Sequence, residues 1–318
     1  MEQRQLGTCG LRVSRLGLGT MTWGRDTTEE EAAGQLTAFA DAGGTLLDTA
    51  DWHGDGDAER VLGRLLAGTV RRSDVVIAGK AGQTHQGPDT SRGHLLDALH
   101  ATLTRLGVDH LDLWQVNCFD PRTPLEETLS ALDAAVTAGK VRYAGVSNFT
   151  GWQLAKAAAL QRSWPGRTPI VSDQVEYSLL NRRPEGELAA AAGDAGVGLL
   201  AWSPLGRGVL TGKYRTGVPA DSRAATPHFA EFVRPYGDER SRRIVESVCT
   251  AADGLGVTPT SVALCWVRDR PGVSAAIVGA RTAAQLTGVL QAEEIALPRE
   301  IGEALDDVSS SAPRGPEA

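Results

Sequence analysis

Residues 46–63 read LLDTADWHGDGDAERVLG: an apolar run, a polar glycine-rich turn and a helical pattern in direct succession. The run Leu46–Asp48 is short and apolar on both sides, which is typical of a parallel strand covered by helices. The stretch Asp57–Ala67 has helical spacing. Residues 46–67 therefore predict one strand–turn–helix unit, with the polar turn at the carboxyl end of the strand.

The same unit recurs along the whole chain. The other strand candidates are Arg15–Leu18, Val75–Ala78, Leu111–Val116, Val141–Ser147, Ile170–Gln174, Gly198–Trp202 and Val273–Val278. Further helical patterns alternate with them over Thr28–Asp41, Ser91–Leu106, Pro124–Ala138, Thr150–Arg162 and Pro184–Ala195. Eight strands in about 300 residues predict an α/β fold of the (β/α)8 TIM barrel type.

A doubly wound sheet is the competing fold for this alternation. It would need a phosphate-binding GxGxxG after the first strand. Gly17–Thr22 reads GLGTMT and Gly206–Thr211 reads GRGVLT, so both segments lack the third glycine. The sequence therefore favours the barrel, as a single domain over residues 1–318.

Three segments lie outside the repeat. Residues 3–13 predict a β-hairpin that closes the bottom of the barrel. Residues 214–238 are rich in Gly, Pro, Arg and Asp and predict one long loop at the carboxyl-terminal face, where long loops are usually functional. Ser309–Ala318 predicts a frayed tail.

Composition limits the class of protein. With 42% hydrophobic and 22% charged residues, the 318-residue chain is too apolar to be disordered. Its net charge of -7 argues against a nucleic-acid or anionic-membrane surface. No apolar run is long enough for a membrane span, and the N-terminus lacks a signal region. The four cysteines form no CxxC pair, so we expect a reduced, cytoplasmic protein without a metal site.

Reactive groups of a barrel lie at the carboxyl ends of its strands. Asp48 ends the second strand and Lys80 follows the third. Since the two strands are neighbours, the two side chains can form a partly buried ion pair that directs charge into the mouth. The alternative is a purely structural pair at the barrel rim.

Several segments together resemble the aldo-keto reductases over nearly the whole chain. They are GLGTMTWG (17–24), DTADWHGDGDAERVLG (48–63), VVIAGK (75–80), DLWQVN (112–117), GKVRYAGVSNF (139–149), SDQVEYSL (172–179), WSPLGRGVLTGKY (202–214) and IVGARTAAQL (277–286). The resemblance implies a barrel that binds NADPH in an extended form. It also implies reduction of carbonyl compounds by a tetrad of Asp, Tyr, Lys and His.

Two of the four tetrad positions differ from the family. Asp48 and Lys80 stand at the Asp and Lys positions. His53 replaces the proton-donating Tyr in the motif DTAxxYG. Asn117 replaces the His, as in the related potassium-channel β subunits, and its amide can still hydrogen-bond a carbonyl oxygen.

The exchange of Tyr for His53 changes the acid–base chemistry. A nearby Lys80 ammonium disfavours imidazolium, while Asp48, Asp51 or Asp55 would oppose that effect. A neutral imidazole is a weak acid and a good general base. The alternative is a loop histidine that faces solvent. His85 is a second candidate for a replacement acid.

The resemblance also implies a set of cofactor residues. Ser147, Asn148 and Gln174 would contact the nicotinamide carboxamide, Tyr177 would stack on its ring, and Arg281 would bind the 2′-phosphate. Trp23 and Trp52 would line the mouth, unless they only pack on each other. The remaining positions are Gly19, Thr20, Met21, Trp202, Ser203, Pro204, Leu205, Gly208, Lys213, Gly279 and, at the adenine, Gln285.

These observations predict an oxidoreductase that moves hydride between NADP(H) and a carbonyl or enone substrate, with atypical acid–base residues. One alternative is a non-redox lyase or epimerase that uses His53 as its base on a keto-sugar or secondary metabolite. Another is an NADP(H)-binding regulatory or partner subunit. No partner other than a small carbonyl-type molecule is expected, and no motif defines the number of subunits.

Overall fold

Eight parallel strands form a closed barrel in the computed structural model, which describes residues 1–220 and 222–310. Their order around the barrel is β10-β11-β12-β3-β4-β5-β8-β9. Their bounds are β3 Leu16–Gly19, β4 Leu46–Asp48, β5 Val76–Ala81, β8 Leu111–Val116, β9 Val141–Ser147, β10 Ile170–Glu176, β11 Gly198–Trp202 and β12 Val273–Val278. The predicted TIM barrel is confirmed, because runs that are apolar on both faces suit strands buried between a core and helices.

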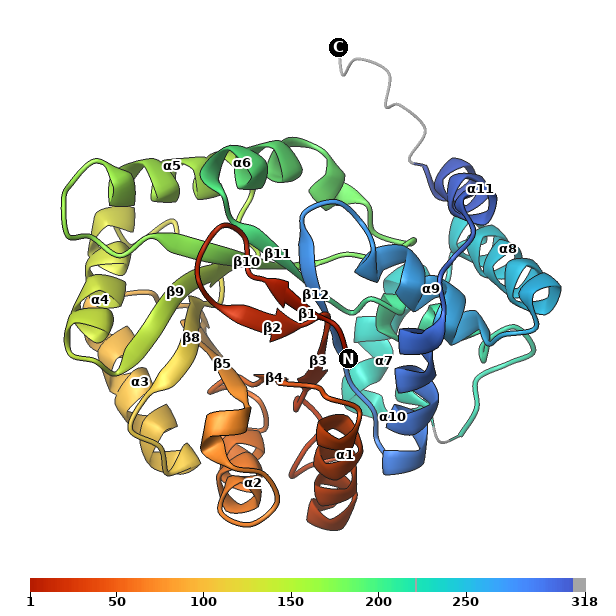
Figure 1. The fold of residues 1–318 in the computed structure, drawn as a ribbon, viewed down its shortest axis with the longest axis horizontal. Helices are drawn as coiled ribbons and strands as arrows, with labels where there is room; N and C mark the ends of the chain where they lie inside the picture. The colour runs from red at the N-terminus through yellow and green to blue at the C-terminus, as the bar shows by residue number, and fades with distance from the viewer. Residues whose placement is uncertain (221, 311–318) are drawn as a thin grey trace.

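Helices surround the barrel on its outside (Figure 1). Those that follow β3 to β10 agree with the predicted patterns: α1 Glu29–Asp41, α2 Asp57–Leu66, α3 Arg92–Leu106, α4 Leu125–Thr137, α5 Gly151–Arg162 and α6 Glu187–Ala195. Local signals fix their ends. The Thr28 side chain accepts a hydrogen bond from the Glu31 amide at the start of α1, and Gly107 adopts the left-handed conformation after α3.

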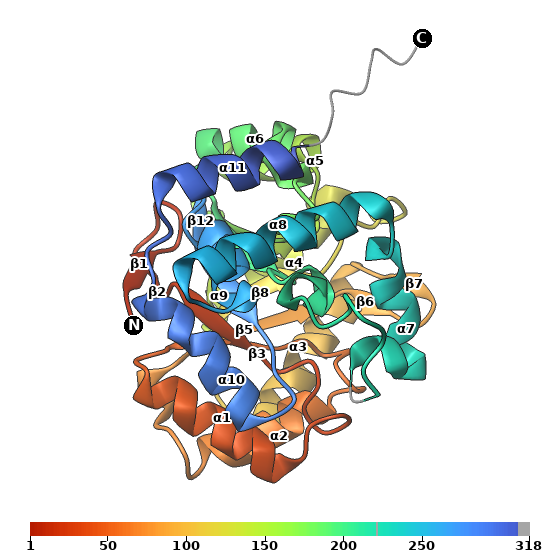
Figure 2. The same ribbon diagram turned by 90° about the vertical axis from the view of Figure 1, so that its right-hand side faces the viewer.

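The last third of the chain adds helices whose bounds were not predicted from the sequence. They are α8 Glu239–Leu255, α9 Pro259–Arg268, α10 Ala283–Leu290 and α11 Arg299–Ser309, and they cover one side of the barrel (Figure 2). Within residues 1–220 and 222–310, no single helix is long and apolar enough to cross a membrane. Only α8 and α9 taken together reach that length and hydropathy, and they are bent by 103°.

The predicted N-terminal hairpin consists of β1 Gln3–Gln5 and β2 Arg12–Ser14. It lies across one opening of the barrel (Figure 1). Leu6 and Val13 are fully buried there and join the cluster that fills the barrel interior, which includes Leu113 and Leu200. The hairpin therefore closes the bottom of the barrel, and the opposite face stays available for ligands.

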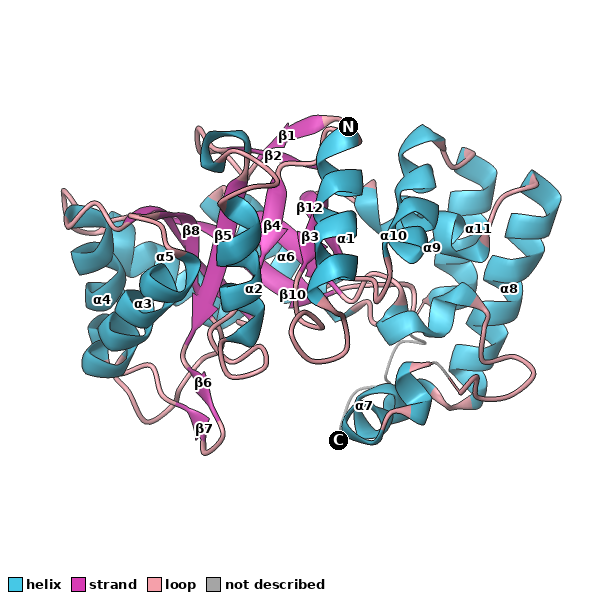
Figure 3. Ribbon diagram, turned by 90° about the horizontal axis from the view of Figure 1, so that it is seen from below, coloured by secondary structure: helices cyan, strands magenta, loops and turns pink. Residues whose placement is uncertain are grey.

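Residues 214–238 are not one loop, so that prediction is corrected. They contain the helix α7, Pro227–Val233. A proline at the first helical position is a start signal, and Phe229 and Val233, four residues apart, bury one face. Figure 3 shows α7 and a small hairpin, β6 Gln83–Thr84 with β7 Gly87–Pro88, at the end of the molecule opposite β1–β2.

The predicted tail is corrected at its first residue. Ser309 is buried and ends α11, where its hydroxyl donates to the Leu305 carbonyl. Residues 311–318 lie outside the part of the chain that the structure describes.

Candidate active site

The ion pair between Lys80 and Asp48 lies inside the barrel, where the carboxyl ends of β4 and β5 meet the pocket. Asp48 pairs with Ala78 across β4 and β5, and the two-residue period of a strand puts Lys80 on the same face. Lys80 Nζ donates to Asp48 Oδ1 over 2.6 Å, and Gln174 Nε2 donates to the same oxygen over 2.6 Å. The two charged side chains are 5% and 6% exposed. The predicted pair is therefore buried, and Asp48 is held from two strands.

His53 lies in the turn between β4 and α2. Its amide donates to the Ala50 carbonyl over 3.2 Å, and its carbonyl accepts from the Ala58 amide. The imidazole is buried, and its Nδ1 has no hydrogen-bond partner among the described residues. It faces the pocket, not open solvent, so the alternative of a solvent-facing loop histidine is wrong.

Burial is the main reason that the pKa of His53 lies well below its ordinary value of 6.5. The charge of Lys80 adds to that effect and Arg25 adds further. The neighbouring aspartates, which were expected to raise the pKa of His53, do not outweigh burial and the two positive charges. The imidazole of His53 is therefore neutral at pH 7.

Asn117 follows β8 directly. Its amide donates to the Ala81 carbonyl over 2.8 Å, and its carbonyl accepts from Asn148 Nδ2 over 3.0 Å. Asp48, His53, Lys80 and Asn117 all line one pocket. The structure thus brings together the four positions that the sequence singled out for catalysis.

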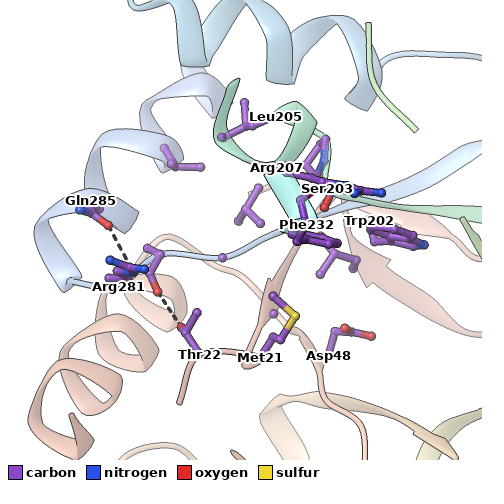
Figure 4. A pocket seen from close by; sticks show the side chains of 18 of the residues that line it. Met21, Thr22, Asp48, Trp202, Ser203, Leu205, Arg207, Phe232, Arg281 and Gln285 are labelled. Atoms are coloured by element: carbon purple, nitrogen blue, oxygen red, sulfur yellow. Dashed lines mark hydrogen bonds between the residues drawn. The ribbon is translucent and has the colours of Figure 1, made fainter. Parts of the chain in front are cut away.

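That pocket has a volume of about 510 Å³ and is elongated. Figure 4 shows Asp48 and Trp202 toward one end and Arg281 with Gln285 toward the other. Its lining carries four cationic side chains and a single carboxylate, in a protein with a net charge of -7. These residues are Lys80, Arg207, Lys213, Arg281 and Asp48. Because its lining has more cationic than anionic side chains, the pocket suits an anionic ligand.

A cluster of amides and hydroxyls lies beside the ion pair. Ser147 Oγ donates to the Gln174 carbonyl over 2.7 Å, and Asn148 Nδ2 donates to Ser147 Oγ over 3.1 Å. Trp202 Nε1 donates to Asn148 Oδ1 over 3.0 Å. Asn148 has a positive φ of 58°, a strained state that is often found at functional sites. These hydrogen bonds hold the amides and the hydroxyl in defined orientations beside the ion pair.

The segment after β11 follows an unusual path along the middle of the pocket. Ser203 and Arg207 have φ values of 49° and 60°, and Gly208 has 94°. A Cβ on Gly208 would lie 3.4 Å from Lys213 Nζ, so glycine leaves that ammonium uncrowded. Small residues and left-handed backbone allow a phosphate group to approach closely.

The far end of the pocket is built around Arg281. Its amide donates to Gln285 Oε1 over 3.0 Å, and its Nη2 donates to Thr226 Oγ1 over 2.8 Å. Thr22 Oγ1 donates to the Ala280 carbonyl over 3.2 Å beside it. With the guanidinium held from two segments, this end suits a phosphate or another anion.

Most of the predicted cofactor residues line this pocket. They are Gly19, Met21, Ser147, Asn148, Gln174, Trp202, Ser203, Pro204, Leu205, Gly208, Lys213, Gly279, Arg281 and Gln285. Trp52, 45% exposed, also lines it and packs edge-on against the His53 ring at 5.2 Å.

Three predicted positions are not among the residues that line this pocket. The Tyr177 hydroxyl donates to Glu185 over 2.8 Å, and its ring packs edge-on against Trp266. Trp23 is fully buried and donates to Gln35. Thr20 is buried with its hydroxyl on the Asp48 carbonyl. Each of the three side chains makes buried hydrogen bonds or packing contacts with other elements. The position of a residue at the end of a strand does not predict such contacts.

Several lining residues had no sequence prediction. Phe232 of α7 stacks with Trp202 at 6.4 Å and 16°, and Arg207 lies over the Phe232 ring (Figure 4). Arg207 is held by two hydrogen bonds to the Glu176 carboxylate. The others are Thr22, Thr211, Thr258, Thr260, Ile277, Val278 and Ala280. The proline at the start of α7 could have predicted a helix that contains Phe232. The presence of the other residues in the pocket depends on long-range packing, which the sequence does not show.

Among the described residues, no group of three or more His, Cys, Asp or Glu side chains is arranged to hold a metal ion.

Comparison with known proteins agrees with this geometry. The model of the Aldo/keto reductase family matches residues 15–310. The chain is 38% identical to "Uncharacterized oxidoreductase YrpG" of Bacillus subtilis (strain 168), over 97% of this chain and 96% of the relative. It is 34% identical to a protein of Oryza sativa subsp. japonica and 32% identical to one of Arabidopsis thaliana, each over 100% of this chain and 99% of the relative. Both are named "Probable voltage-gated potassium channel subunit beta". The chain belongs to the aldo/keto reductase family.

Proposed function

We propose that this protein is an oxidoreductase that transfers hydride between NADP(H) and a carbonyl or enone substrate. The observation that carries the proposal is the buried Lys80–Asp48 pair beside His53, at one end of a pocket with cationic groups along its length. Membership of the family and the relative named as an oxidoreductase support the general activity.

The pocket fits an extended phosphate-bearing dinucleotide. Lys213 and Arg281 would hold its phosphates, and the uncrowded face of Gly208 would admit them. Ser147, Asn148 and Gln174 would orient the nicotinamide. NADP(H), when bound, supplies or accepts the hydride.

His53 and Lys80 would handle the substrate oxygen. Since His53 Nδ1 is covered, Nε2 is the ring atom left to meet it. A neutral imidazole can donate one N–H hydrogen bond, and the adjacent ammonium stabilises negative charge that develops on oxygen. Because the pKa of His53 lies below its ordinary value, its charged form is scarce at pH 7 and enone reduction, which needs less acid strength, is favoured.

The test is NADPH oxidation with a panel of aldehydes, ketones and enones, using wild type and His53→Tyr. Tyrosine restores the family's acid, so we expect ketone reduction to rise at least about tenfold. His100→Tyr, on the exposed face of α3, is the matched control. Absence of turnover with the entire panel would contradict the proposal; tight NADPH binding without turnover, with a stable protein partner, would favour a regulatory subunit.

A non-redox reaction is the second candidate, because a neutral buried imidazole is suited to accept a proton. His53 would remove a proton next to a carbonyl group, leading to elimination or epimerisation. The discriminating measurement is mass spectrometry of keto-sugar substrates in D2O. Deuterium in a product of unchanged oxidation state supports this reaction, and an unlabelled, reduced product excludes it.

A further inference from the structure

A second cavity adjoins the pocket and has no role in the proposed hydride transfer. It also measures about 510 Å³ and is lined by Asp51, Trp52, Asp55, Gln83, Thr84, His85 and Asn117. Trp52 and Asn117 line both cavities, so the second one opens beside the ion pair and His53. A substrate held at His53 could extend its far end into this space.

The two cavities differ in charge. The first is lined by Lys80, Arg207, Lys213 and Arg281, whereas the described lining of the second holds no lysine or arginine. It has two carboxyl groups, and its lone histidine, His85, is already hydrogen-bonded to Asp55 over 2.9 Å. The second cavity is therefore unsuited to a phosphate and suited to groups that donate hydrogen bonds.

The hairpin side of the second cavity has its polar groups satisfied. Gln83 Nε2 donates to the Thr84 carbonyl, and Gln83 Oε1 accepts from the Cys118 thiol. Thr84 Oγ1 donates to the Gly87 carbonyl over 2.8 Å. These contacts fix the β6–β7 hairpin as a wall of defined shape.

Asp51 is the exception in this lining. Its Oδ1 is covered and has no hydrogen-bond partner among the described residues. Burial and the nearby Glu59 raise the pKa of Asp51 to about 7, so the carboxyl exists in both forms near neutrality. A hydroxyl group can donate to the ionised form and accept from the protonated one. The torsion that turns a carboxylate is broad, so a small rotation can present Oδ1 to a ligand.

We propose that this second cavity is a subsite for the hydroxylated, unphosphorylated end of the carbonyl substrate, with Asp51 as its specificity-determining residue. An alkyl chain in the same place would leave the carboxyl of Asp51 without a partner. The inference rests on the proposed function for the reacting carbonyl, but binding at the subsite does not require turnover.

The test compares D-erythrulose with 2-butanone, which share four carbons and the ketone position. Wild type should favour erythrulose in kcat/KM, and Asp51→Leu should lower that preference about tenfold, mainly through KM. The ratio between wild type and variant cancels the electronic effect of the hydroxyls. Asp51→Asn, which keeps one acceptor oxygen and removes the titration, should lose less than Asp51→Leu. Asp41→Leu, at the exposed end of α1, is the control.

Charge selection gives a second arm. Wild type should reduce dihydroxyacetone in preference to dihydroxyacetone phosphate, because the subsite has no lysine or arginine. Reduction of both four-carbon ketones with an unchanged ratio in Asp51→Leu, or a preference for the phosphate ester, overturns the subsite and leaves the proposed function intact.

Binding separates the two proposals if nothing is reduced. Erythritol, which cannot be reduced, should bind to the full chain without cofactor in saturation-transfer NMR, and Asp51→Leu should weaken that binding about tenfold. Binding of this kind supports the subsite even where the hydride reaction fails. Equal binding to both proteins, or none to wild type, overturns it.

Discussion

Two buried carboxyl groups in the barrel wall, those of Asp48 and Asp173, differ in their hydrogen-bond partners. Asp48 is 4% exposed and accepts hydrogen bonds from Lys80 and Gln174. Asp173, directly before Gln174 on β10, is fully buried and neither of its oxygens has a hydrogen-bond partner among the described residues. Because successive strand residues face opposite sides, Gln174 points to Asp48 and Asp173 points toward the helical layer. Asp48 therefore has a cationic partner on the interior side, whereas Asp173 has no hydrogen-bond partner among the described residues on the outer side.

The difference appears in protonation. Burial raises the pKa of Asp173 to about 8, so this group is mostly neutral at pH 7. Asp48 instead has a lysine as its partner at 2.6 Å, in a charge-assisted hydrogen bond. Burial of a carboxyl group therefore does not by itself indicate a catalytic site. The groups that contact the carboxyl determine whether it can take part in one.

The largest effect is expected on removing the lysine. Lys80→Met leaves the Asp48 charge buried without its cation, which should lower the free energy of unfolding by about 3–5 kcal/mol. Turnover of any reducible substrate should fall at least about a thousandfold, since the field at the substrate oxygen is lost. Chemical denaturation and steady-state kinetics measure the two effects.

Lys140→Met is the matched control, because Lys140 is exposed in the turn after α4. It should change neither quantity measurably. If Lys80→Met kept the wild-type turnover while the fold stayed intact, the pair would be a structural feature of the rim, and the comparison with Asp173 would lose its functional meaning.

A smaller effect is expected at Asp173. A carboxyl whose pKa is raised on folding binds its proton more tightly in the folded state, so its contribution to stability falls as the pH rises from about 4 to about 8. Asp173→Asn cannot ionise and should remove that fall. The free energy of unfolding of the variant, relative to that of wild type, should therefore be about 4 kcal/mol more favourable at pH 9 than at pH 5. Urea denaturation at both pH values measures it.

The exposed Asp194→Asn at the end of α6 is the control and should leave the pH profile of stability unchanged. A profile for Asp173→Asn that runs parallel to wild type would mean that Asp173 is ionised in the folded protein. It would then have a partner, and the outer side of the wall would hold charge as well as the inner side does.

The same contrast explains how much of the fold and of the site can be predicted from the sequence. Apolar runs located the strands, and strand ends then located Asp48, Lys80 and Asn117, since both depend on local periodicity. Tyr177 does not line the pocket, because the direction of its side chain depends on Glu185 and Trp266, which come from other elements. Phe232 was missed because the position of α7 is set by packing across the mouth. Local pattern fixes which strand end a residue occupies; distant partners fix where its side chain points.

The smallest effect is expected at His85, which forms a hydrogen-bonded pair with Asp55 near the mouth of the barrel. His85 and Asp55 are 88% and 77% exposed, so water screens the interaction and competes for both groups. His85→Gln should shift Tm by less than about 1 °C, in contrast to the Lys80 variant. Differential scanning calorimetry of the variant and the wild type checks this. A shift of several degrees would show that the His85–Asp55 pair holds the β6–β7 hairpin in place, and burial would then no longer explain why the Lys80–Asp48 pair matters more than this exposed pair.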